Sequence, residues 1–190
     1  MGVDEKPLIV AFGGSLGADY FNSVVCDYIC DCIKGGRDYR FIMSAGKNNR
    51  YEKLLNKFKE NGVNPDTCEN ITLAEYIYDM EYALNAVDLI IARSGSSVSE
   101  MLAAGKPSVL IPSPNVAGNH QEHNARAVEA NGAAVVITED KLNLESLKEK
   151  ANTILDDDNL IGKMSAAAEK YAITDATEKL CDLLCELKDR

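Results

Sequence analysis

Six short apolar runs recur along the chain, and segments with helical spacing separate them. The runs predict strands at residues 8–12, 39–43, 71–76, 89–92, 108–111 and 134–137. Apolar residues three and four apart predict helices at residues 18–33, 51–60, 79–86, 97–104 and 120–131, with three more helical stretches filling residues 144–188. Strands that are apolar throughout are typical of a parallel sheet covered on both faces. We therefore expect an α/β fold, a Rossmann-like doubly wound sheet with right-handed crossovers.

Length and composition favour one domain that spans residues 1–190. The chain has 190 residues, of which 46% are hydrophobic and 26% charged, as in ordinary globular proteins. The sequence shows no internal repeat, low-complexity stretch or linker. Its formal net charge of -10 argues against binding to nucleic acid or to an anionic membrane, because both are polyanions. A small anionic ligand is still possible, since it needs only a local positive field.

The chain also lacks the sequence signals of membrane insertion or export. No apolar run approaches the roughly 20 residues of a membrane span, and the first residues lack the basic-then-apolar layout of a secretion signal. We therefore expect a cytoplasmic protein with no direct membrane insertion.

In that compartment the six cysteines are expected to be reduced. Cys26 and Cys30, and likewise Cys181 and Cys185, are four residues apart, so each pair can share one helix face. A four-thiolate zinc site built from the two helices is an alternative, but the usual zinc-knuckle spacings are absent. We favour cysteine as a small buried apolar residue.

Ligands of doubly wound sheets bind beyond the carboxyl ends of the strands, so the loops there are the candidate sites. The first strand runs into Gly-Gly-Ser-Leu-Gly-Ala at residues 13–18 and then into a helix. Gly14 and Gly17 allow a tight turn, the helix N-terminus offers unpaired N–H groups, and Ser15 adds a hydroxyl donor. The loop can bind a phosphate, or its glycines can serve packing alone. Its spacing is neither that of NAD-binding loops nor that of Walker loops.

A second strand, glycine turn and helix start follow the run at residues 89–92. Ser96 or Ser97 suits a helix N-cap, and Glu100 falls in the first turn, where it can complete a capping box or accept hydrogen bonds from ribose hydroxyls. Two helix N-termini that converge can neutralise a diphosphate without a metal, so we expect no metal and no cofactor. The candidate binding residues of this loop are Arg93, Ser94, Gly95, Ser96, Ser97 and Glu100.

A third loop, at residues 112–124, contains both histidines of the chain. His120 and His123 do not form the H-E-x-x-H zinc pair, because only two residues separate them. A single histidine here can equally be a surface or capping residue. Polar side chains such as those of Gln121 and Asn124 suit the recognition of sugar hydroxyls.

Taken together and in order, these segments resemble the C-terminal, donor-binding half of the MurG-type enzymes of glycosyltransferase family 28. The resemblance covers residues 8 to about 187 and implies a GT-B architecture, of which this chain is a single C-terminal domain. It rests on GGSLGA (13–18), EYIYDM (75–80), ARSGSSVSEMLAAGKPSVLIP (92–112), NHQEHNAR (119–126), GAAVVI (132–137) and ITDATEKL (173–180).

The resemblance implies a site for UDP-N-acetylglucosamine (UDP-GlcNAc). It places Ser15, Ser96 and Ser97 against the diphosphate, and Glu100 against the ribose hydroxyls. It further places the backbone of Ile77 against uracil, and His120 and Gln121 against the sugar. Residues 93–100 are one residue shorter than the family's R-[SA]-G-x-x-T-x-x-E, so the separate roles of Ser96 and Ser97 stay open.

The resemblance also implies a reaction that this chain does not complete alone. The family transfers GlcNAc with inversion to a lipid-linked peptidoglycan intermediate, and its N-terminal acceptor domain has no counterpart in residues 1–190. We expect a donor-binding half that is inactive without an acceptor domain, and we assign it no catalytic residue. The alternatives are a donor subunit that joins a separate membrane-bound acceptor subunit, and a UDP-sugar hydrolase or binding module.

The C-terminal segment carries an apolar stripe at helical spacing, made of Leu180, Leu183, Leu184 and Leu187. We expect weak self-association or partner binding through it. The alternative is that the stripe packs on the domain's own core.

Overall fold

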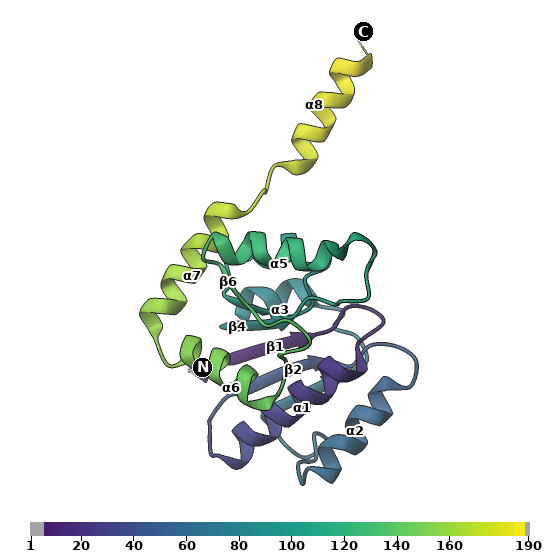
Figure 1. Cartoon of the computed structure of the whole chain (residues 1–190), viewed down its shortest axis with the longest axis vertical. Helices are drawn as coiled ribbons and strands as arrows, with labels where there is room; N and C mark the ends of the chain where they lie inside the picture. Colours follow the sequence, from purple (N-terminus) through teal and green to yellow (C-terminus); the bar gives the residue numbers. More distant parts are fainter. Residues whose placement is uncertain (1–5, 189–190) are drawn as a thin grey trace.

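The computed structural model describes residues 6–188, which contain one six-stranded sheet (Figure 1). Its order is β3-β2-β1-β4-β5-β6, and all neighbouring strands are parallel. The predicted doubly wound sheet is confirmed, and its switch point lies between β1 and β4. The strands are β1 (Leu8–Phe12), β2 (Arg40–Ser44), β3 (Ile71–Ala74), β4 (Leu89–Ala92), β5 (Ser108–Leu110) and β6 (Ala134–Val136).

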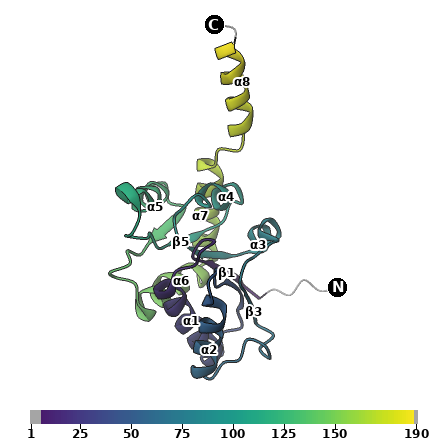
Figure 2. The ribbon, with the colours of Figure 1, turned by 90° about the vertical axis from the view of Figure 1, so that its right-hand side faces the viewer.

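The helices lie close to the predicted ranges and cover both faces of the sheet (Figure 2). Apolar residues of α1, α2 and α6 pack on one face, those of α3, α4 and α5 pack on the other, and α7 contributes to both cores. The helices are α1 (Asp19–Lys34), α2 (Arg50–Glu60), α3 (Met80–Ala86), α4 (Val98–Ala103), α5 (His120–Ala130), α6 (Leu144–Leu155), α7 (Asp158–Tyr171) and α8 (Ala176–Lys188).

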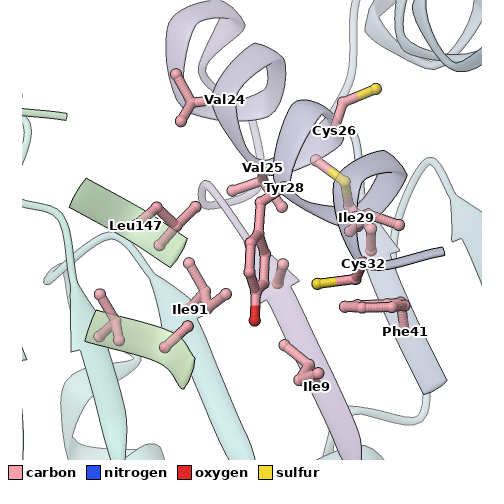
Figure 3. Close-up of a cluster of buried hydrophobic side chains, with 14 of the residues drawn as sticks. Ile9, Val24, Val25, Cys26, Tyr28, Ile29, Cys32, Phe41, Ile91 and Leu147 are labelled. Atoms are coloured by element: carbon pink, nitrogen blue, oxygen red, sulfur yellow. The ribbon is translucent and has the colours of Figure 1, made fainter. Parts of the chain in front are cut away.

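Two hydrophobic cores explain why the strands are apolar throughout. Ile9 of β1 belongs to the core under α1, and its neighbour Val10 belongs to the core on the opposite face. Successive side chains of a strand point to opposite faces, so a strand covered on both sides needs apolar residues at every position. Figure 3 shows the first core around Tyr28, whose hydroxyl donates a hydrogen bond to Asn152 (3.1 Å).

The cysteines of α1 are buried, as the prediction of small apolar residues requires. Cys26, Cys30 and Cys32 lie in the core under α1. Cys181 and Cys185 are exposed on α8, so the interpretation as small buried residues is wrong for these two. All six thiols are free. The pairs on α1 and α8 lie on separate parts of the molecule (Figure 1), so the four-thiolate zinc alternative is wrong.

Burial predicts which thiols react. Brief treatment of the native chain with iodoacetamide should modify Cys181 and Cys185 first, because both are exposed. Cys32 should stay protected, since burial raises the pKa of its thiol to about 11 and the thiolate is the reactive form. Peptide mass spectrometry measures the order of modification. Equal labelling of Cys32 and Cys181 would show that α1 is not packed as described.

Helix α8 stands away from the rest of the molecule, beyond a short coil after α7 (Figures 1 and 2). Its four leucines are 52–57% exposed. The alternative that this stripe packs on the domain's own core is therefore wrong, whereas self-association or partner binding stays a prediction. Between residues 6 and 188, none of the helices is long and apolar enough to cross a membrane.

Candidate functional site

A cavity of about 370 Å³ opens at the switch point of the sheet, where β1 and β4 end. Loops from three strand ends form most of its wall, and α5 adds one residue. Its lining consists of Phe12, Gly13, Gly14, Ser15, Ser44, Tyr76, Ile77, Met80, Arg93, Gly95, Ser96, Ser97, Glu100 and Gln121.

The structure thus brings most of the predicted binding residues together around one space. Those that line the cavity are Gly14, Ser15, Ile77, Arg93, Gly95, Ser96, Ser97, Glu100 and Gln121. Gly17, Ser94, His120 and Asn124 do not line it. Larger hollows occur elsewhere, of about 540 Å³ near the amino ends of β1 and β2 and about 880 Å³ beyond the carboxyl ends of β5 and β6. We assign the site to the smaller cavity because, of these three, it is the one at the switch point between β1 and β4.

The two glycines of the first loop have different roles. Gly14 has a φ of 85° with open space around its α-carbon, and it lines the cavity. Gly17 has a φ of 74° and lies against Ala45 and Gly46, so that a β-carbon there would overlap the carbonyl oxygen of Ala45. Packing therefore explains why residue 17 is a glycine. Gly14 is the one of the two that a ligand in the cavity can contact.

The start of α1 offers donors for an anion. Its N-cap residue, Ala18, makes no side-chain cap hydrogen bond. The N–H groups of a first helical turn have no intrahelical partners and carry a partial positive charge. Arg50 anchors the same loop from α2 by donating to the carbonyl of Leu16 (2.9 Å). The loop is thus held in place from outside the cavity, while Ser15 borders the cavity.

The second loop presents Gly95, Ser96 and Ser97 to the cavity, and α4 begins directly after them. Ser97 is the N-cap, yet its side chain makes no cap hydrogen bond. The capping box predicted as one role of Glu100 is therefore not formed. Glu100 lines the cavity instead, where its carboxylate can accept hydrogen bonds from a ligand.

Arg93 borders the cavity, but its guanidinium is occupied by the protein. It donates to the carbonyls of Ile111 (3.1 Å) and Pro112 (3.0 Å) and pairs with Glu139. It also lies over the ring of Phe21, 5.6 Å from the ring centroid. Arg93 thus joins the ends of β4, β5 and β6 to α1 and positions the second loop.

Ser94 and Asn124 fasten the second loop to α5. The hydroxyl of Ser94 donates to the carbonyl of Gln121 (2.7 Å), and the amide of Asn124 donates to the carbonyl of Ser94 (3.2 Å). Neither side chain reaches the cavity, although both were predicted to bind ligand. The side chain of Gln121 does line it, and its oxygen accepts the N–H of Ser113 (2.9 Å).

His120 lies outside the cavity at the exposed start of α5. Its ring nitrogen Nδ1 is 3.0 Å from the carbonyl oxygen of Ala117. The structure therefore shows a local hydrogen bond for His120, and its predicted contact with a sugar stays a prediction. Among the residues that the structure describes, no three His, Cys, Asp or Glu side chains are grouped to hold a metal ion.

Sequence reasoning missed several lining residues, including Ser44, Tyr76 and Met80. Ser44 is a polar residue next to the predicted apolar run at residues 39–43, and that contrast is a usable signal. Tyr76 and Met80 lie in the EYIYDM segment together with Ile77, and their place in that motif is the signal for them.

A single doubly wound sheet, with a cavity walled by two strand–glycine–helix loops, defines a Rossmann-like domain of the kind found in GT-B glycosyltransferases. Residues 8–180 match the model of the glycosyltransferase family 28 C-terminal domain. The chain belongs to this family.

Curated relatives agree with the family assignment and are about twice as long. In Acetivibrio thermocellus a UDP-N-acetylglucosamine–N-acetylmuramyl-(pentapeptide) pyrophosphoryl-undecaprenol N-acetylglucosamine transferase is 40% identical over 184 residues. The match covers 96% of this chain and 48% of that relative. A transferase of the same name in Ruminiclostridium cellulolyticum is 36% identical, with coverage of 97% and 50%. The chain thus spans about half the length of these relatives.

Solved structures show the same architecture. The crystal structure of Acinetobacter baumannii MurG superimposes with a TM-score of 0.82 at 26% identity, covering 97% of this chain and 51% of MurG. A structure of S. aureus MnaA with UDP has a TM-score of 0.75 at 17% identity, covering 97% and 47%. At that identity the second likeness shows a shared fold alone.

Proposed function

We propose that this chain is the UDP-GlcNAc-binding half of an inverting transferase that adds GlcNAc to a lipid-linked peptidoglycan intermediate. The observation that carries the proposal is the cavity at the switch point, into which both predicted glycine loops open. The names of the relatives support the donor and the acceptor. In this proposal residues 1–190 are the donor domain, which acts in the cytoplasm, at the cytoplasmic face of the membrane when joined to its acceptor half.

The lining residues suggest how the donor lies in the cavity. The diphosphate fits between the loop of Gly14 and Ser15 and the loop at residues 95–97, where backbone N–H groups and hydroxyls are available. The side chain of Ile77 is buried, which leaves its backbone to pair with uracil. Glu100 then accepts hydrogen bonds from the ribose. Gln121 borders the sugar end, with His120 beyond it at the rim.

The proposed chemistry is direct displacement at the anomeric carbon. An acceptor hydroxyl attacks this carbon while the bond to UDP breaks and UDP carries away the electron pair. N–H groups and hydroxyls aimed at the diphosphate stabilise the charge that develops on the leaving group. A general base for the acceptor hydroxyl would come from the other half of the transferase. This chain on its own would therefore bind the donor without transferring the sugar.

Calorimetric titration of the chain with UDP-GlcNAc tests the proposal, and heat of binding is the expected result. If no heat is measured at millimolar UDP-GlcNAc, the proposal that this chain contains a donor site is wrong. Transfer to an acceptor by the chain alone would contradict the need for a second half. Release of free GlcNAc in the absence of any acceptor would instead identify a UDP-sugar hydrolase.

The role proposed for Glu100 gives a sharper test. Glu100→Gln should weaken UDP binding about tenfold, the loss expected when a charged acceptor of hydrogen bonds is removed. The variant should also lose most of the wild-type preference for UDP over 2′-deoxy-UDP, because both changes remove the same contact. Glu122→Gln, in the first turn of α5, is the matched control and should leave binding unchanged. A Glu100→Gln variant that keeps the full preference would exclude the ribose contact.

We further propose that the leucine stripe of α8 packs against the acceptor half. The relatives contain a second half of similar length, and the stripe is exposed in the half described here. The same contact would serve a fused acceptor domain or a separate membrane-bound acceptor subunit. The two cases differ in whether the acceptor half lies on the same polypeptide, which purification of the native protein with its partner would show.

A double variant, Leu183→Asp with Leu184→Asp, should abolish binding to the unmatched half of the Acetivibrio thermocellus relative when the two are co-expressed. The variant should melt at the wild-type temperature, because neither side chain is buried in this chain. Tyr82→Asp, an exposed position on α3, is the control and should still bind. Co-purification measures the association. If light scattering shows that the stripe instead joins two copies of this chain, self-association replaces this proposal.

A further inference from the structure

Ser44 is a buried polar residue whose position no packing requirement explains. It is the last residue of β2, it is 4% exposed, and it lies between Phe12 of β1 and Ala74 of β3 in the sheet register. Strands covered on both faces favour β-branched and other apolar side chains. A serine here therefore calls for a partner for its hydroxyl.

That partner is the carbonyl of Glu75, the first residue after β3. The hydroxyl of Ser44 donates to it at 3.1 Å, and the N–H of Gly46 donates to the same oxygen at 3.0 Å. Glu75 is followed at once by Tyr76 and Ile77, which both line the cavity. The carbonyl is thus held from two sides directly before the chain enters the cavity wall.

Little else holds this stretch of backbone. Along the described chain, the backbone groups of Tyr76, Ile77 and Tyr78 make no hydrogen bond to another strand or helix, and only a local turn at residues 78–79 precedes α3. Tyr76 is half-exposed and its ring meets that of Tyr78 edge-on, with centroids 5.2 Å apart, so this side chain does not anchor the segment to the core. The buried side chain of Ile77 fixes the far end. The bonds to Glu75 fix the near end.

We propose that Ser44 is a positioning residue for the base end of the donor cavity. Its hydroxyl holds the Glu75 carbonyl, and this fixes the direction in which the backbone of Tyr76 and Ile77 faces a bound base. The inference rests on the proposed function, because it assumes that the base lies against Ile77. The hydroxyl of Ser44 and the carbonyl of Glu75 make no hydrogen bond to the phosphate loops at residues 13–18 and 93–97.

The test compares UDP with ADP, because the two share a diphosphate and differ in the base. Titration of the full chain with each nucleotide should show that Ser44→Ala weakens UDP binding about fivefold, the loss of one hydrogen bond, and ADP binding less than twofold. The preference for UDP over ADP should fall accordingly. Ser44→Thr, which keeps the hydroxyl and suits a strand, should restore the wild-type preference. Ser44→Cys has a similar shape but only a weak hydrogen-bond donor, so it should behave like Ser44→Ala. If the alanine variant does not fold, the cysteine variant provides the same comparison.

Each other result counts against the proposal. Equal losses for UDP and ADP would show that Ser44 supports the cavity in general and not its base end. If Ser44→Ala leaves UDP binding unchanged, the hydroxyl has no role in binding. The same conclusion follows if Ser44→Thr does not restore the wild-type preference for UDP. If the wild-type chain binds UDP no better than ADP, the assumed base site and the proposed function fail before the variants are compared.

Discussion

Gly17→Ala should destabilise the chain by about 3 kcal/mol or more and abolish donor binding. The added β-carbon overlaps the carbonyl oxygen of Ala45, and the positive φ of 74° is itself unfavourable for alanine. Relief of the overlap must separate the first loop, which borders the cavity, from the segment directly after Ser44, which lines it as well. Thermal unfolding should show a melting temperature about 6–12 °C lower, and calorimetry should show no binding of UDP-GlcNAc.

Gly36→Ala separates these two causes. Gly36 has a φ of 73°, nearly that of Gly17, but a β-carbon there meets nothing within 4 Å. This control should therefore lose only the cost of the backbone conformation, about 1–2 kcal/mol, and keep donor binding. If both variants melt at the same temperature, the contact between Gly17 and Ala45 contributes nothing to stability.

Arg93→Met should lower the free energy of unfolding by about 2–4 kcal/mol and weaken donor binding strongly. Methionine fills much of the space but leaves the carbonyls of Ile111 and Pro112, and the carboxylate of Glu139, without their donor. The second loop then loses its connection to β5 and β6. Urea unfolding measures the loss of stability, and titration with UDP-GlcNAc measures the loss of affinity.

Two comparisons identify the cause of that loss. Arg126→Met removes an arginine that pairs with Glu129 on the exposed side of α5, and should cost under about 1 kcal/mol. Adding Glu139→Gln to Arg93→Met should restore part of the stability, because it removes the unpaired charge of a partly buried carboxylate. A variant of Arg93 that is as stable as the Arg126 variant would exclude a structural role for the guanidinium.

Periodicity predicted the fold well because each strand is apolar at every position. A strand such as residues 89–92, buried on both sides, allows few alternatives to a parallel sheet, and glycine or proline marks most element ends. The surface against which the last helix packs could not be predicted. A leucine stripe at helical spacing looks the same whether it packs on its own domain or on another surface.

The site was predicted less completely because residue type does not reveal the direction of a side chain. Arg93 and Ser94 lie in the loop that borders the cavity, yet Arg93 donates to carbonyls directly after β5 and Ser94 donates to the carbonyl of Gln121 in α5. Gly17 has the residue type of a phosphate loop but serves a contact between two turns. Ser44 comes from a strand outside the predicted loops, and the sheet order brings it to the cavity.

The exposed leucines of α8 favour association between copies of this chain, and the net charge of -10 opposes it. Apolar stripes attract over short range, while the shared negative charge repels over about 8 Å at physiological ionic strength and over less as salt rises. The solubility of the chain in salt therefore depends on whether α8 is covered. On our proposal that an acceptor half covers α8, the assembled protein should resist precipitation by salt, whereas this chain alone should rely on its negative charge to stay dispersed.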